Sequence, residues 1–187
     1  MNKDKNVVSL HEAAHAISAI YLRLKLRKAT IKAKGRTDGY VETEPSTKIR
    51  MFRRKGDGYA IVDVEAKKRQ FFEKNIIMAF AGFAADKLYS PARWKSVRYS
   101  GDRSYIESFR KKGKIPKSEL PRLLAEAERL VSIPTVQNAI VLTAMGLERA
   151  WKSDAEVAAS TIRSIYSWSL KTDPRYLQTV RMAGTPR

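Results

Sequence analysis

The spacing of apolar residues divides the chain into helical and extended segments. From residue 6 to about residue 22, apolar positions recur at intervals of three and four, as they do on one face of a helix. Two runs rich in strand-forming residues, 27–34 and 40–44, then flank a glycine-containing turn, and Pro45 follows. This pattern predicts an amphipathic helix followed by a β-hairpin.

The pattern beyond residue 45 predicts a second hairpin and then only helices. Gly56-Asp57-Gly58 supplies turn chemistry between two strand-like runs within 47–64. A helix is expected over 65–89, because Pro91 stops the apolar periodicity, and a loop over 92–101. Further helices are expected over 102–110, 118–131, 135–152 and 154–170, with a basic linker over 111–117 and with Ser118 and Asp154 as N-caps.

These elements together predict an α+β fold, in which a first helix and a small sheet of hairpins precede a C-terminal helical bundle. A chain of 187 residues is long enough for one domain with a sizeable core. We expect residues 1–110 to form the core that carries the active chemistry. Residues 111–182 would form a C-terminal helical part of the same domain, and residues 183–187 a frayed tail.

Composition changes this picture mainly through charge. The formal net charge is +18, although the hydrophobic and charged fractions of 43% and 30% are ordinary for a soluble globular protein. A solvated basic face, a contact with nucleic acid or an anionic membrane, and attraction of acidic polypeptides would each explain the charge. Because no recognised nucleic-acid-binding module is evident, charge alone does not choose among them.

Composition also predicts the compartment and restricts metal chemistry. No segment approaches the roughly 18 consecutive apolar residues that span a bilayer, and the sequence MNKDKNVV contains no apolar leader. We therefore expect a soluble, cytoplasmic protein. The chain has no cysteine, which excludes disulfides and thiolate metal ligands.

The two histidines of the chain, His11 and His15, lie four residues apart, and Glu12 follows the first. Residues at i and i+4 share one face of a helix, so both imidazoles can bind one ion, and neutral imidazole suits zinc. A glutamate in this position can take a proton from a zinc-bound water and return it to a leaving amine. The motif predicts a zinc site with Glu12 as general base.

A catalytic zinc takes three protein ligands, and since no other histidine or cysteine exists, the third must be an aspartate or a glutamate. The metzincin class is excluded because Ser18 and Tyr21 stand where it requires glycine and histidine. A second interpretation stays open. Ser9 and Glu12 also fit a capping box, in which Glu12 would only close the N-terminus of the helix.

Several short motifs occur in a recognisable order. HEAAHA at 11–16 leads into Lys28-Ala-Thr-Ile31 and then Gly39-Tyr40, and a later block reads AFAGFAADKL at 79–88. In this order they resemble the peptidase domain of the FtsH-type membrane AAA+ proteases, with its HEAGHA helix, its strand ending K-V-T-I, its G-Y turn and its G-G-R-A-A-E-E-L helix. Asp86 stands at the first acidic position of that last motif.

This resemblance implies a zinc peptidase and indicates a third ligand. The family's ligand aspartate opens a helix after a G-A-S-N-D-L loop, and Asp102 follows Gly101 at the equivalent place, with Glu107 in reserve. Asp102 could instead be a simple N-cap. Asp86 would hydrogen-bond a ligand histidine. Ala14 replaces a family glycine, a change that we expect the helix to tolerate.

We therefore expect an ATP-independent zinc metalloendopeptidase acting on flexible or unfolded polypeptides, because no G-x-x-x-x-G-K-S/T motif of an ATPase is present. Substrate would lie extended against the strand at 40–44. One alternative is the group of HExxH peptidases that cleave phage-type repressors; 83–91 resembles its F-A-A-x-L-L-M-P run, but 75–82 lacks the required carboxylate. Others are a basic nucleic-acid-binding protein with a structural or degenerate HExxH motif, and a protein in which zinc only adds stability.

Overall fold

The computed structural model describes residues 3–32, 39–44, 64–91, 100–153 and 155–172. Within these ranges the protein is mostly helical, with a small antiparallel sheet, which agrees with the predicted α+β class. The elements follow one another as α1 (Lys3–Tyr21), β1 (Leu26–Thr30), β2 (Tyr40–Thr43), α2 (Val64–Tyr89), α4 (Ser100–Lys112), the 3-10 helix η1 (Lys117–Glu119), α5 (Leu120–Val131), α6 (Pro134–Lys152), β3 (Val157–Ala158) and α7 (Ala159–Lys171).

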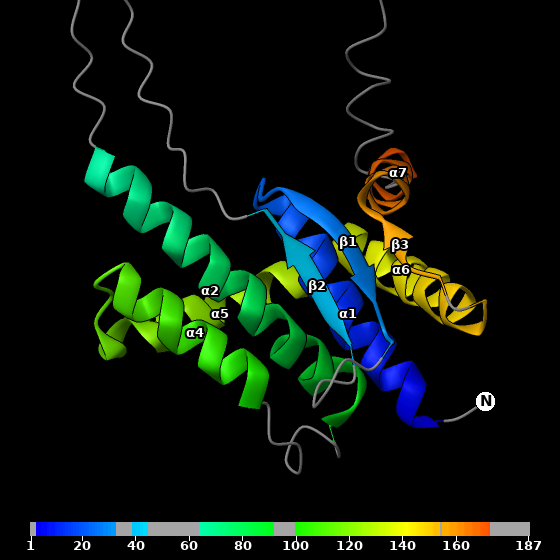
Figure 1. Cartoon of the computed structure of the whole chain (residues 1–187), viewed down its shortest axis with the longest axis horizontal. Coiled ribbons are helices and arrows are strands. Elements are labelled where there is room, and N and C mark those ends of the chain that lie inside the picture. Colours follow the sequence, from blue (N-terminus) through cyan, green and yellow to red (C-terminus); the bar gives the residue numbers. More distant parts are fainter. Residues whose placement is uncertain (1–2, 33–38, 45–63, 92–99, 154, 173–187) are drawn as a thin grey trace, which may run out of the picture.

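Helix α1 lies at the centre of the molecule (Figure 1). It packs on α2 and α6, and β1 and β2 cover a further side. Every residue from 12 to 19 is consequently buried, so this helix is enclosed rather than amphipathic as predicted. Small side chains make the enclosure possible, because alanines at 13, 14, 16 and 19 let the neighbouring elements approach closely. Ala14 is fully buried at the position of the family's glycine.

The sheet has the order β2-β1-β3, and both pairings are antiparallel. Ala29 in β1 pairs with Val41 of β2 on one side and with Val157 of β3 on the other. This leaves β2 as an edge strand of the sheet formed by the described residues. The predicted strand at 40–44 is thus placed beside the first helix.

The third strand corrects the prediction of one helix over 154–170. Val157 and Ala158 pair with β1, and α7 begins only at Ala159, with no side-chain hydrogen bond at its N-cap, Ala158. A partner about 130 residues away in sequence creates this strand, and local periodicity carries no sign of it. Asp154, the predicted N-cap of that helix, lies outside the described residues.

The other helices follow the prediction closely, with corrections at their ends. Helix α2 spans the expected 65–89 and α6 the expected 135–152, each within one residue. Ser118 was expected to cap a helix but lies inside η1, and the N-cap of α5, Glu119, makes no side-chain cap bond. The second hairpin and the first turn up to residue 38 lie outside the described residues. So do residues 92–99 of the loop predicted over 92–101, but residues 100 and 101 belong to α4, which corrects the end of that loop.

None of the described helices has by itself the length and apolarity needed to cross a membrane. Only η1 and α5 taken together with α6 meet that test, as a pair bent by 79°.

The burial of α1 predicts a large cost for removing its main aliphatic side chain. Ile17→Ala should lower the free energy of unfolding by about 2–5 kcal/mol, because Ile17 is fully buried and the neighbouring helices cannot collapse into the space. Val141→Ala, on the exposed face of α6, is the control and should change stability by about 0.5 kcal/mol or less. Urea unfolding of the metal-free protein measures both. Equal effects would contradict the central position of α1.

Candidate metal centre

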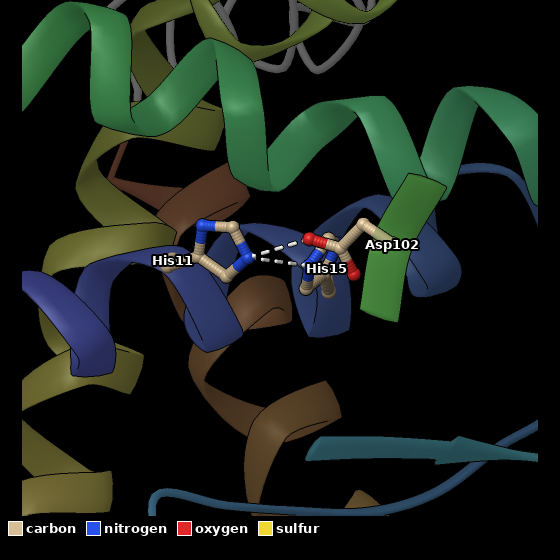
Figure 2. A group of neighbouring side chains, drawn as sticks. All are labelled: His11, His15 and Asp102. Carbon is tan, nitrogen blue, oxygen red and sulfur yellow. Dashed lines mark hydrogen bonds and ion pairs between the residues drawn. The ribbon is translucent and has the colours of Figure 1, made fainter. Parts of the chain in front are cut away.

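Two histidines from α1 and one aspartate from α4 meet between the helices (Figure 2). Nε2 of His11 lies 3.0 Å from Nε2 of His15 and 3.0 Å from Oδ2 of Asp102. Nε2 of His15 lies 3.5 Å from Oδ1 of Asp102. We call these three residues the metal centre. Asp102 is 91 positions from His11 in sequence, and the fold brings together the three residues that the sequence singled out.

Helix α2 fixes both imidazole rings from behind. Nδ1 of His11 lies 2.9 Å from Oδ2 of Asp86, which is the contact with a ligand histidine expected for Asp86. Nδ1 of His15 lies 2.8 Å from the carbonyl oxygen of Met78. A carbonyl oxygen only accepts, so Nδ1 of His15 carries a proton and donates it. Each ring therefore turns its Nε2 toward the centre, and in the neutral tautomer that atom presents a lone pair.

The closeness of the two histidines and Asp102 shifts the pKa values of all three side chains. Burial lowers the pKa of His11, but hydrogen bonds to Asp102 and Asp86 outweigh burial and raise it to about 10. The pKa of His15 is likewise raised, because Asp102 outweighs the effect of burial. Burial favours the neutral form of Asp102, yet the two histidines hold the pKa of that carboxyl well below its usual range. Without metal, the raised pKa values of both histidines therefore favour a positively charged pair of rings at neutral pH.

The donor set and its spacing fit a metal ion. Tetrahedral bonds of 2.0–2.1 Å place ligand atoms about 3.3 Å apart, and one nitrogen of each ring and one oxygen of Asp102 all lie within 4.8 Å of one another. The three residues can therefore hold an ion with little rearrangement. The side chain of Asp102 is 26% exposed, against 13% for His11 and 7% for His15, so solvent reaches the centre from the side of α4.

Glu12 lies beside the histidines, buried beneath the start of β2. Burial raises the pKa of its carboxyl, although the two histidines act in the opposite direction. Gly39 explains how the strand passes so closely. A Cβ atom at Gly39 would lie 2.7 Å from Cγ of Glu12 and 2.9 Å from the carbonyl oxygen of Thr30. The glycine before β2 therefore leaves the room that Glu12 occupies.

Two simpler interpretations of these residues do not agree with the structure. Ser9 lies in the middle of α1, where its hydroxyl is 2.8 Å from both the Asn6 carbonyl oxygen and Oε1 of Glu148, so Ser9 and Glu12 form no capping box. Helix α4 begins at Ser100, which places Asp102 inside its first turn rather than at an N-cap.

Glu107, the reserve ligand, lies away from the metal centre. Nε of Arg110 donates to its Oε2 at 2.8 Å, and this hydrogen bond lowers the pKa of Glu107 to about 2. Glu107 is not one of the three residues whose ligand atoms converge.

Gly82 on α2 is a residue of the centre that sequence reasoning missed. A Cβ atom there would lie 2.6 Å from both Nε2 and Cε1 of His11 and 2.6 Å from Cε1 of His15. Any side chain would consequently displace an imidazole. The signal was present in the AFAGFAADKL block, where Gly82 matches a glycine of the family motif, but only contact across the helices reveals its purpose.

A scan against protein-family models and a search of curated proteins both gave no match for this chain.

The raised pKa of His11 predicts that metal binding releases a proton. At pH 7 the metal-free ring is protonated, and a metal ion must displace that proton to reach Nε2. Affinity for Zn²⁺ should rise by at least about tenfold per pH unit between pH 6 and 8, with at least one proton released per ion, because the pKa of His15 is raised as well. Calorimetry in buffers of different ionisation enthalpy counts the protons. Binding at pH 7 without proton release would contradict the assignment.

Gly82→Ala should crowd the two rings and weaken metal binding by about tenfold or more, since the new methyl group lies against both histidines. Gly146→Ala on α6 is the matched control, because nothing lies within 4 Å of a Cβ atom there. The control should keep its metal affinity and gain about 0.5–1 kcal/mol of stability from helix propensity. Wild-type metal affinity in Gly82→Ala would show that the rings are free to move.

Proposed function

We propose that this protein is an ATP-independent zinc metalloendopeptidase, related to the FtsH-type peptidase domain, that hydrolyses peptide bonds in flexible or unfolded polypeptides. One observation carries the proposal. The Nε2 atoms of His11 and His15 and the carboxylate of Asp102 converge within hydrogen-bonding distance of one another, with Glu12 buried beside them. The HExxH motif alone could not distinguish a catalytic site from a pair of unrelated histidines.

The donor set favours zinc as the ion. Two imidazole nitrogens and one carboxylate are a common set of protein ligands for a catalytic zinc, which keeps a further position open. Such an ion would lower the pKa of a coordinated water to about 7 and polarise a substrate carbonyl. Asp86 and the Met78 carbonyl would hold the two rings in the orientation that such binding needs.

Glu12 has the placement and the basicity of a general base. Glu12 is 7% exposed and burial raises the pKa of its carboxyl, so the carboxylate binds a proton more readily than an exposed glutamate would. In the proposed reaction Glu12 accepts a proton from the attacking water and then gives it to the leaving amine. Its burial also keeps bulk water from competing for that proton.

The position of β2 at the edge of the sheet is an argument for a polypeptide substrate. β1 is paired with β3 on its far side, so β2 (Tyr40–Thr43) is the edge strand of the described sheet, and pairing with such an edge is a common way to bind an extended chain. Gly39, directly before this strand, touches Glu12, so a peptide paired with β2 would run past the metal centre. An extended segment must be flexible or unfolded, which agrees with the lack of an ATPase motif.

The alternative of a degenerate, non-catalytic HExxH motif explains less of the structure. A nucleic-acid-binding protein would have no use for a buried Asp86 and a half-buried Asp102 against the histidines, since withdrawing carboxylates from water is costly. Asp86 and Asp102 both engage His11. The other alternative is a zinc ion that only adds stability. In that case Glu12 would have no chemical role, so the effect of changing Glu12 separates this alternative from catalysis.

Glu12→Gln should reduce cleavage of an unfolded protein such as casein by about 10²- to 10⁴-fold, because the general base is lost, while one zinc per chain is retained. Asp102→Ala should lose both zinc and cleavage. Glu107→Gln, on the same helix, is the control and should keep both. Metal analysis and the release of labelled peptides are the measurements.

These variants separate the proposed function from its alternatives. If wild type and Glu12→Gln bind zinc equally and neither cleaves, the ion is structural. Full cleavage by Glu12→Gln would exclude the mechanism.

A further inference from the structure

The turn between α4 and η1 carries an unusual concentration of positive charge. Five of the eight residues from 110 to 117 are basic, and four of these are lysines. All four lysine side chains are exposed. We call this segment the lysine turn; its lysines are Lys111, Lys112, Lys114 and Lys117.

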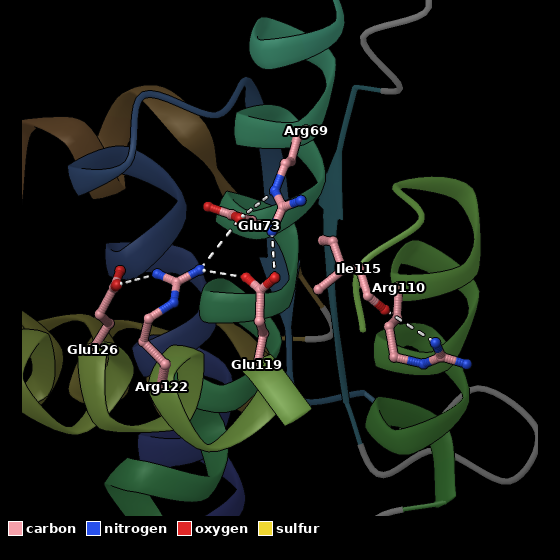
Figure 3. A network of polar contacts seen from close by, with 7 residues as sticks. All are labelled: Arg69, Glu73, Arg110, Ile115, Glu119, Arg122 and Glu126. Atoms are coloured by element: carbon pink, nitrogen blue, oxygen red, sulfur yellow. Dashed lines mark hydrogen bonds and ion pairs between the residues drawn. The ribbon is translucent and has the colours of Figure 1, made fainter. Parts of the chain in front are cut away.

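The backbone of the lysine turn is held in one shape (Figure 3). Arg110 donates from one guanidinium nitrogen to the Ile115 carbonyl oxygen at 3.0 Å and from another to Glu107 at 2.8 Å. Ile115 is fully buried, and a Cβ atom at Gly113 would lie 2.7 Å from Cβ of Phe72 on α2. Lys114 has a φ of 51°, in the left-handed region. The turn is thus anchored at several points, and the lysines project from a fixed frame.

Acidic side chains near the lysine turn are already engaged. Glu107 pairs with Arg110 and lies 3.8 Å from Lys111. On the neighbouring surface formed by α2, η1 and α5, Glu73 and Glu119 bind Arg69 and Arg122 (Figure 3). That network largely balances its own charges, so the lysines of the turn keep an excess of positive charge.

The lysine turn lies away from the metal centre. Asp102 is in the first turn of α4, whereas Lys112 is its last residue. Ten residues of helix separate them, which corresponds to about 15 Å. The charge of the turn is therefore not needed to balance the ligands of the metal centre.

We propose that the lysine turn is a binding site for the phosphate backbone of nucleic acids. Lysines act as point charges for phosphates, and several on a rigid turn can contact successive phosphates of one chain. The net charge of +18 would add long-range attraction for such a polyanion. This site does not depend on the proposed peptidase activity.

An anionic membrane is a less suitable partner for this surface. Membrane-surface binding combines basic residues with apolar side chains that enter the lipid. The large exposed apolar side chains of the described residues lie on other elements, and none belongs to the lysine turn; they are Tyr21, Leu88, Val141, Met145, Trp151 and Trp168.

The test compares two variants of equal net charge. In the first, all four lysines of the turn are changed to glutamine. The control carries the same change at four exposed lysines elsewhere, namely Lys25, Lys67, Lys152 and Lys171. Binding of a labelled oligonucleotide to the full chain is followed by fluorescence anisotropy between about 50 and 200 mM salt.

Wild type and the control variant should bind with a steep salt dependence. The turn variant should bind about tenfold or more weakly at low salt, and its slope of log K against log salt should be smaller by about 3. Replacing the four lysines by arginine should preserve binding. Circular dichroism checks that each variant is folded.

Other results would overturn the proposal. Equal weakening of both glutamine variants would mean that binding follows net charge alone. Lack of oligonucleotide binding by wild type, or stronger binding to polyglutamate or to phosphatidylserine vesicles, would assign the surface to another partner. Glu12→Gln should bind the oligonucleotide like wild type, so failure here and failure of the peptidase proposal can be told apart.

Discussion

Two imidazole nitrogens facing one another at 3.0 Å are the constraint on which the centre of this protein depends. The Met78 carbonyl and Asp86 accept hydrogen bonds from the far sides of the rings, so two neutral histidines would point lone pairs at each other. That arrangement is repulsive unless a cation lies between them. Protonation of the histidines, whose pKa values are both raised, relieves this repulsion in the metal-free protein, and a metal ion between the rings would relieve it with a larger charge.

The surrounding charges favour the larger cation. Asp86 and Asp102 both engage His11, and Oδ1 of Asp86 is buried with no hydrogen-bond partner among the described residues. These two carboxylates lie in a poorly solvated place and need positive charge beside them. A divalent ion would compensate both. The packing follows from the same need, because Gly82 and Gly39 keep methyl groups away from the rings and from Glu12.

The sequence was enough to single out the residues of this centre. It was not enough to predict the contacts that hold them in position. The local spacing of His11, Glu12 and His15 was enough to predict that they share one helix. Apolar periodicity was enough to predict the bounds of α2 and α6. Asp102 needed the resemblance to a family, since nothing in its local sequence distinguishes it from a helix cap. The Met78 carbonyl has no side-chain signal, and β3 exists only through its pairing with β1. Long-range contacts determine these features.

Helix α4 supports opposite kinds of chemistry at its two ends for one physical reason. The positive end of a helix dipole lies at its N-terminus, where it stabilises the carboxylate of Asp102 in addition to the two histidines. The negative end lies where Arg110, Lys111 and Lys112 occur, so the dipole partly offsets their mutual repulsion. Tyr105 stacks on Phe109 and donates to Asn75 of α2, which holds the helix in place between the two ends. The direction of α4 therefore suits both an anionic metal ligand and a cationic surface, and reversing it would disfavour both.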